Sequence, residues 1–261
     1  MKQIIHNKGF TAYQLKIGAL FFMILDHCHT YLGIGPTWIA LLPRFVAPLF
    51  VYFLVEGFHY TSDRRKYFTR VAIFATLMFI GNISINYYFK NVDPMTNQMT
   101  LYSLLQGNNI FFTLSLHLLL LGCIERFKRV NAAHRLIYAV AFILITFVSL
   151  AFSEGGLYLY PILFLSYSFM NDKQTLSAGI IAWSLLFFIK AIITYATGAS
   201  GISLIDTLLF NNEWAMAFVV VPLLLYSNQR GRNDSFSKWL FYIVYPAHLW
   251  ILMILRYLII A

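Results

Sequence analysis

Charged residues are scarce in this sequence. Only 11% of its 261 residues carry a charge, while 60% are hydrophobic. A water-soluble domain cannot hide that much apolar surface, because a large part of its own surface must face solvent. The composition therefore excludes a chain of soluble domains and predicts one integral membrane domain over residues 1–261.

Several functional signatures are also missing. The sequence has no P-loop, no G-x-S-x-G elbow and no H-E-x-x-H motif. Asp26, His27, Cys28 and His29 are all able to bind metal, but four consecutive residues of a helix cannot face one ion, so no metal is predicted. The only other cysteine, Cys123, is expected near the opposite membrane face from Cys28, which disfavours a disulfide.

The net charge of +9 does not indicate a nucleic-acid partner, because the cations lie in short loops beside apolar runs. These runs predict an all-α, polytopic transmembrane bundle of about nine helices. Residues 157–170 contain Pro161, which predicts a break or a kink, and residues 201–210 fit either a re-entrant piece or part of the eighth span. The predicted spans are 14–33, 44–60, 68–88, 108–124, 133–152, 157–170, 176–196, 214–227 and 239–260.

The basic residues predict the orientation of these spans. One set of loops holds nearly all of them, and the other set holds only Lys90, with Arg44 and Arg256 at helix ends. By the positive-inside rule, the N-terminus is cytoplasmic and the C-terminus is outside. The residues of the basic set are Lys2, Lys8, Arg64, Arg65, Lys66, Arg70, Arg126, Lys128, Arg129, Arg135, Lys173, Arg230, Arg232 and Lys238.

Ionisable residues within the first span suggest chemistry, because a charge in hydrocarbon is costly. Lys16 and His27 are eleven residues apart, so they share one helix face roughly 16 Å apart along the axis. His27 suits a general base, and Lys16 suits an anion at the cytoplasmic mouth, which fits a long acyl-CoA. The alternative is structural: Lys16 snorkels to the interface and His27 bonds a neighbouring helix. Position alone leaves both interpretations open.

Other polar residues of the spans are candidates to line a cavity. Arg44 enters the second span at its outer end, while Glu56 and His59 lie one turn apart at its inner end. Pro48 is expected to kink this span. In the last span, Tyr245 and His248 lie on either side of Pro246, which is also expected to kink its helix. The basic run that contains Arg64, Arg65 and Arg70 suits nucleotide phosphates, although such runs more often mark only topology.

Three ordered motifs resemble the TraX family. The first is Leu-Lys-Ile-Gly-Ala-Leu-Phe-Phe-Met-Ile-Leu-Asp-His at residues 15–27. The second is Pro-Arg-Phe-Val-Ala-Pro-Leu-Phe-Val-Tyr-Phe-Leu-Val-Glu-Gly-Phe from residue 43, with the His, Thr and basic run that follow. The third is Phe-Tyr-Ile-Val-Tyr-Pro-Ala-His-Leu from residue 241. The resemblance extends from residue 15 to about residue 253.

This resemblance implies an activity. The founding member is known as the acetylase of conjugative pilin, and the family is grouped with wider transmembrane acyltransferases. These share an Arg or Lys, ten residues and then a His in the first helix, a spacing that Lys16 and His27 match. The resemblance implies that His27 is the catalytic base, with Asp26 beside it, and that Lys16 helps to hold CoA. It also implies a bacterial cytoplasmic membrane protein.

The sequence therefore predicts acetyl transfer from cytosolic acetyl-CoA to an amine or hydroxyl on the outer side. The acceptor is open and includes a peptide N-terminus, a glycan or a lipid. Cys28 as an acyl-carrying nucleophile ranks below direct transfer. Two other functions stay open: a proton-coupled transporter, and a non-catalytic scaffold for a surface or conjugative assembly. The bilayer and acyl-CoA are the expected partners.

Overall fold

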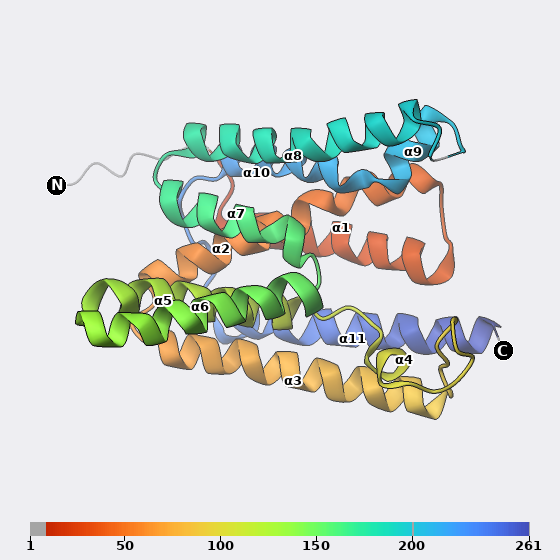
Figure 1. Ribbon diagram of the computed structural model, residues 1–261, viewed down its shortest axis with the longest axis horizontal. Helices are drawn as coiled ribbons and strands as arrows, with labels where there is room; N and C mark the ends of the chain where they lie inside the picture. The colour runs from red at the N-terminus through yellow and green to blue at the C-terminus, as the bar shows by residue number, and fades with distance from the viewer. Residues whose placement is uncertain (1–8, 200, 261) are drawn as a thin grey trace. The chain divides into compact units, whose positions relative to one another are not determined.

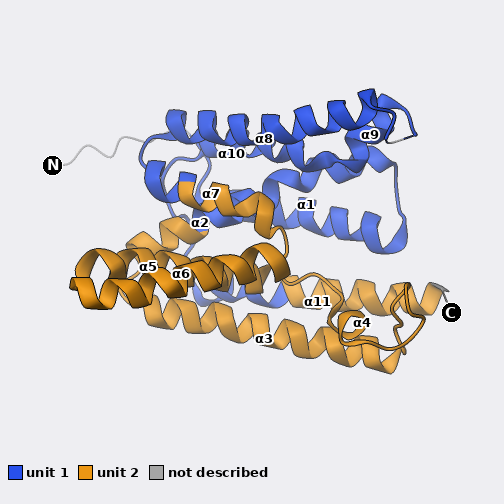
Figure 2. Cartoon of the chain, in the orientation of Figure 1, with its two compact units in different colours: residues 1–53, 165–244 blue, residues 54–164, 245–261 orange. Residues whose placement is uncertain are grey.

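Helices make up the fold of this chain. The computed structural model describes residues 9–199 and 201–260, and within them every named element is an α- or 3-10 helix (Figure 1). Lys2 and Lys8 of the predicted basic set lie outside the described residues. The chain divides into two compact units, one of residues 1–53 and 165–244 and the other of residues 54–164 and 245–261 (Figure 2). The prediction of one domain stays a prediction.

The first unit is built from both halves of the sequence. Its N-terminal part holds a helix, a 3-10 segment and the start of a second helix, and its C-terminal part packs further helices against them. Three of its helices, α2, α7 and α11, are divided between the two units. Its elements are α1 (Ala12–Leu32), η1 (Thr37–Phe45), α2 (Val46–Tyr60), α7 (Gly156–Phe169), α8 (Lys173–Ala196), α9 (Leu204–Phe210), η2 (Asn212–Val219), α10 (Val220–Leu225) and α11 (Ser235–Ile260).

The second unit adds α3 (Arg64–Tyr88), α4 (Leu101–Leu105), α5 (Ile110–Arg129) and α6 (Ala132–Phe152). The green helices α5 and α6 form an antiparallel hairpin, and α3 packs along α5 (Figure 1). A close approach joins α3 to α11, because a Cβ added at Gly81 would lie 2.2 Å from Cζ2 of Trp250. Gly81 therefore lets the Trp250 ring lie on the backbone of α3, as small residues do between membrane helices.

Polar side chains set where the long helices begin. Asp63, Asn109, Asn131 and Asp172 each accept a hydrogen bond from a backbone N–H in the first turn of the helix that follows. At the start of α1, Thr11 and the side chain of the third helical residue form a reciprocal capping box. Such caps satisfy backbone donors that the helix itself leaves without a partner.

The expected effects of two prolines can be compared with the structure. Pro48 lies in the first turn of α2, directly after the change from 3-10 helix to α-helix at Val46, and the expected kink there stays a prediction. Of the two alternatives predicted at Pro161, a break is wrong, because α7 runs through that residue as one helix, while a kink stays a prediction.

Six helices among the described residues are long and apolar enough to cross a membrane. A bent pair, α9 with η2 and α10 at 64°, would make a seventh and covers the stretch left open at residues 201–210. The multi-pass architecture is therefore confirmed, but the count of nine is not. That count also needs α1, whose Lys16, Asp26 and His27 lower its apolar character, and α7, which has only 14 residues.

Candidate functional site

The first helix places Lys16 and His27 as the sequence predicts, on one continuous α-helix. The His27 side chain is buried, with 7% of its surface exposed, and its ring lies edge-on to Tyr31 at 6.4 Å between centroids. Lys16 is half-buried near the start of the helix. An imidazole in a buried setting and an ammonium about three turns away thus share one rigid element.

The Lys16 ammonium lies against an aromatic cluster. Its Nζ atom is 4.8 Å from the centroid of the Phe53 ring, within the range of a cation–π contact. The Phe53 ring in turn lies edge-on to Tyr226 at 5.3 Å. These contacts position the Lys16 side chain, and both interpretations of Lys16 stay open.

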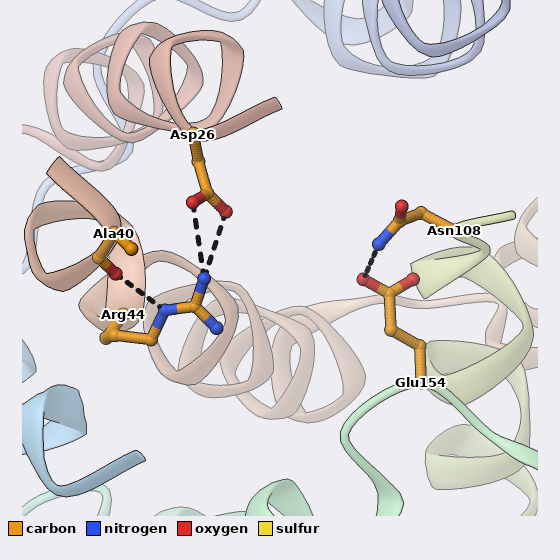
Figure 3. Close-up of polar contacts among 5 residues, drawn as sticks. All are labelled: Asp26, Ala40, Arg44, Asn108 and Glu154. Atoms are coloured by element: carbon orange, nitrogen blue, oxygen red, sulfur yellow. Dashed lines mark hydrogen bonds and ion pairs between the residues drawn. The ribbon is translucent and has the colours of Figure 1, made fainter. Parts of the chain in front are cut away.

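The predicted catalytic residue Asp26 forms an ion pair with Arg44. One amino nitrogen of Arg44 donates to both carboxylate oxygens of Asp26, each at 3.2 Å (Figure 3). The Nε of Arg44 donates to the carbonyl of Ala40 at 2.9 Å. The pair links α1 to η1 within the first unit. A carboxylate bound in this way holds its helix in place, and it lies one residue from His27.

The predicted residues at the end of α2 belong to the second unit. His59 is exposed, and its Nδ1 lies 2.9 Å from the carbonyl oxygen of Val55 one turn earlier. Glu56 is half-buried. The cavity-lining roles of Glu56 and His59 stay predictions.

The predicted phosphate-binding arginines differ from one another. Arg64 is fixed, because its Nε donates to the carbonyl of Phe58, its guanidinium lies 4.2 Å from the Phe58 ring, and it pairs with Glu125 at 3.6 Å. Arg65 and Arg70 are exposed. Arg64 therefore fastens the turn between α2 and α3, and the Arg70 guanidinium lies 5.7 Å from the centroid of the Tyr67 ring. The binding of phosphate by the three arginines stays a prediction.

Tyr245 and His248 lie together on α11 in the second unit, with ring centroids 5.8 Å apart. The Tyr245 hydroxyl accepts a hydrogen bond from the backbone N–H of Ile110 at 3.0 Å. It also lies 3.5 Å from a carboxylate oxygen of Glu154. Tyr245 thus connects α11 to the first residue of α5, and its ring is buried.

Glu154 is the residue that sequence reasoning missed. It lies in the turn between α6 and α7, where its carboxylate accepts from the Asn108 side chain at 2.8 Å (Figure 3) and from the Asn109 backbone N–H at 2.7 Å. Thr113 donates to its backbone carbonyl at 2.8 Å. The sequence alone could have pointed to Glu154, because it is one of only ten acidic residues and lies between two apolar spans.

One other ionisable side chain of the second unit, His117, is fully buried. It lies in α5, and neither of its ring nitrogens has a hydrogen-bond partner within the described part of the chain. No group of three or more His, Cys, Asp or Glu residues that could hold a metal ion occurs there either. His117 thus lies apart from any potential ligand cluster.

The comparisons with known proteins agree with the three motifs. The family model described as TraX protein matches residues 11–256. The probable fimbrial assembly protein FimC, serogroup H1, of Dichelobacter nodosus is 27% identical over 258 residues, covering 93% of this chain and 94% of the relative. No solved structure matches the chain. A family match over nearly the whole length shows that the chain belongs to the TraX family.

Proposed function

We propose that the chain is a transmembrane acyltransferase that moves an acetyl group from cytosolic acetyl-CoA to an amine or hydroxyl acceptor on the outer side of the membrane. The observation that carries the proposal is the pairing of a buried His27 with Lys16 on one helix of the first unit. Imidazole is the side chain best suited to general base catalysis near neutral pH. Membership of the TraX family supports the same activity.

In the proposed reaction, His27 takes the proton from the N–H or O–H group of the acceptor as that group attacks the thioester carbonyl carbon. The bond between this carbon and sulfur then breaks, and the imidazolium returns the proton to the departing thiolate. The products are the acetylated acceptor and CoA. The step needs no other reactant, and it needs no metal.

Arg44 is the group we assign to the developing oxyanion. Its guanidinium has five N–H donors, and the bonds to Asp26 and Ala40 use Nε and one amino group. The other amino group has no hydrogen bond to any described residue. Donors held in place before the reaction stabilise such a charge far better than mobile ones. In this proposal, Asp26 is a positioning residue that holds Arg44.

The test is a transfer assay in proteoliposomes given labelled acetyl-CoA on one side and a mixture of peptide, glycan and lipid acceptors on the other. His27→Ala should lower acetyl transfer by about 10²–10⁴-fold, the usual contribution of a general base. His134→Ala is the matched control, because that histidine is exposed at the start of α6. Normal transfer by a folded His27→Ala protein would refute the assignment.

A second function is favoured by the name of the relative, a probable fimbrial assembly protein. On that likeness, the chain is a membrane scaffold for a surface filament and performs no chemistry. The two proposals differ in a single comparison. A scaffold supports filament assembly equally well with His27→Ala, whereas an acyltransferase whose product is needed for assembly does not. Solute uptake without an acyl donor would instead favour a transporter.

A further inference from the structure

The segment between α3 and α5 has an inverted distribution of side chains. In its short helix α4, Ser103 is fully buried, whereas Leu101 and Tyr102 are 71% and 66% exposed. Leu105 is exposed as well. In water, a helix packed on a protein turns its apolar side chains inward and its polar ones outward. The arrangement in α4 is the reverse of what an aqueous loop favours.

The exposed face of α3 ends where this segment begins. α3 is one of the helices long and apolar enough to cross a membrane, and its outward side chains recur every three or four residues, so they form one stripe. Tyr87 and Tyr88 close the helix and are 67% and 79% exposed. Tyrosine is enriched where a membrane helix passes from hydrocarbon to headgroups. The exposed residues of the stripe are Ile73, Leu77, Ile80, Ser84 and Tyr87.

The opposite face of α3 supplies hydrogen bonds to the segment. The Asn86 amide donates to the carbonyls of Leu104 and Gln106 at 2.9 and 2.8 Å, and the Asn82 amide donates to the carbonyl of Asn108 at 3.4 Å. These carbonyls lie at the end of α4 and just after it, where a helix leaves its last acceptors without partners. Water would satisfy them in an aqueous loop. Side chains that serve this purpose are needed where water is scarce.

The remaining polar groups of the segment bind one another. The Asn91 amide donates to the Ser103 carbonyl and to Oε1 of Gln106, each at 2.9 Å. The Ser103 hydroxyl lies 3.0 Å from the Asn91 carbonyl oxygen, to which it donates, and Ser103 also forms a reciprocal capping box with Thr100. The polar side chains therefore face inward, and the apolar side chains of α4 are left on the outside.

We propose that residues 91–106 lie in the lipid interface beside the end of α3, with Leu101, Tyr102 and Leu105 against the bilayer. The partner is lipid because α4 packs on the end of α3 (Figure 1), and its exposed apolar side chains add to the face that α3 turns to the membrane. The sequence alone leaves this segment as a connection between two spans. The inference does not depend on the proposed function, since it assigns no chemistry to these residues.

The experiment measures which surroundings a spin label meets in the full chain in phosphatidylcholine nanodiscs. Cys28 and Cys123 are replaced by serine, and Leu101→Cys or Tyr102→Cys then carries the label. Oxygen concentrates in lipid, whereas a neutral nickel chelate stays in water. The ratio of the two collision rates should be several-fold higher at both labelled positions than at a position in water.

Two reference positions calibrate this ratio. Ile143→Cys lies on α6, a helix apolar enough to cross a membrane, where the native side chain is 65% exposed, and it represents lipid. Asn171→Cys is exposed in the turn between α7 and α8 and represents water. The labelled positions are all on the surface, so the fold should tolerate them, and a melting temperature for each variant checks this.

Two results would overturn the inference. A ratio at residues 101 and 102 equal to that at residue 171 would make the segment an aqueous loop. Low collision rates with both reagents would show that protein, such as a second copy of this chain, covers α4 in place of lipid. A bimane label at the same cysteines gives an independent reading. Phosphatidylcholine with brominated acyl chains should quench it at residue 101 nearly as strongly as at residue 143, and quenching no stronger than at residue 171 would contradict the proposal.

Discussion

Arg44 donates from one amino nitrogen to both carboxylate oxygens of Asp26 at 3.2 Å, although 18 residues separate them in the sequence. The side chains are 33% and 14% exposed, respectively, so the pair is partly shielded from water. The pairing fixes η1 against the part of α1 that carries His27. It also gives Asp26 a partner that the sequence did not identify.

Breaking this pair should destabilise the first unit. Arg44→Ala leaves the Asp26 carboxylate partly buried without its cation, which should lower the free energy of unfolding by about 1–3 kcal/mol. Asp26→Asn should cost a similar amount, and the double variant should cost less than the sum. Thermal denaturation in detergent measures these changes. Additive losses would show that the two residues do not stabilise each other.

Glu154 should stabilise the second unit through its contacts with the start of α5. Glu154→Gln removes the negative charge near the helix N-terminus and places an amide where the Asn108 and Asn109 donors point. We expect a loss of about 1–3 kcal/mol. Glu213→Gln is a control in the first unit and should leave the melting temperature within experimental error. An equal loss for both variants would assign the effect to net charge.

Gly81 should tolerate no side chain. Gly81→Ala would place a Cβ 2.2 Å from the Trp250 ring, so α3 and α11 must separate and the melting temperature must fall. Gly122→Ala on α5 is the matched control, because a Cβ there meets nothing within 4 Å. It should gain about 0.5–1 kcal/mol from helix propensity. Trp250→Ala should relieve part of the loss at Gly81, and the lack of any relief would argue against this contact.

Asn86 should hold the segment between α3 and α5. Its amide donates to the carbonyls of Leu104 and Gln106 at 2.9 and 2.8 Å, and its oxygen accepts from Tyr257 at 2.8 Å. Asn86→Asp keeps the acceptor but loses both donors, so residues 91–106 should become sensitive to limited proteolysis. Tyr257→Phe removes the third bond alone and should leave this segment resistant. Cleavage at equal rates in both variants would mean that the amide donors are not what anchors it.

The start of α11 should depend on pH through Asp234. The Ser237 backbone N–H and the Arg232 side chain hold the pKa of Asp234 at about 2, below its usual value of 3.8. Because the folded-state pKa is lowered, this stabilisation is present above about pH 3.8 and is lost as the pH falls toward 2. Asp234→Asn should therefore melt below the unmodified chain at pH 5 and close to it at pH 2. A difference that does not change with pH would exclude an effect of this carboxylate.

Much of the fold was predictable because it depends on neighbours within one segment. Apolar runs of about twenty residues predict membrane helices, and a spacing of eleven residues on one helix fixes how Lys16 and His27 are related. Local rules are weak at two places. The predicted break at Pro161 was wrong, because that residue lies inside a helix that continues. The two alternatives left open for residues 201–210 both fit a pair of helices bent by 64°.

The candidate site was predictable only in part. The phosphate-binding role of Arg64, Arg65 and Arg70 stays a prediction, and the structure adds that Arg64 is held by Phe58 and Glu125. Nothing in the sequence distinguishes Arg64 from Arg65, because which of two adjacent arginines faces a neighbouring helix depends on how α3 is rotated against α5. Glu154 could have been singled out as an acidic residue between two apolar spans, but its partners could not, since they lie about 45 residues away.

By itself, then, the sequence determined that the chain is a multi-pass helical membrane protein of the TraX family and that one helix carries both Lys16 and His27. Only the tertiary structure decided that Asp26 meets Arg44, that Glu154 meets the start of α5, and that Asn86 holds the segment between α3 and α5. The reason is combinatorial: 19 Lys and Arg residues and 25 Phe residues offer many equivalent pairings. Packing of the helices selects among them, because only residues that face one another across a close contact can interact.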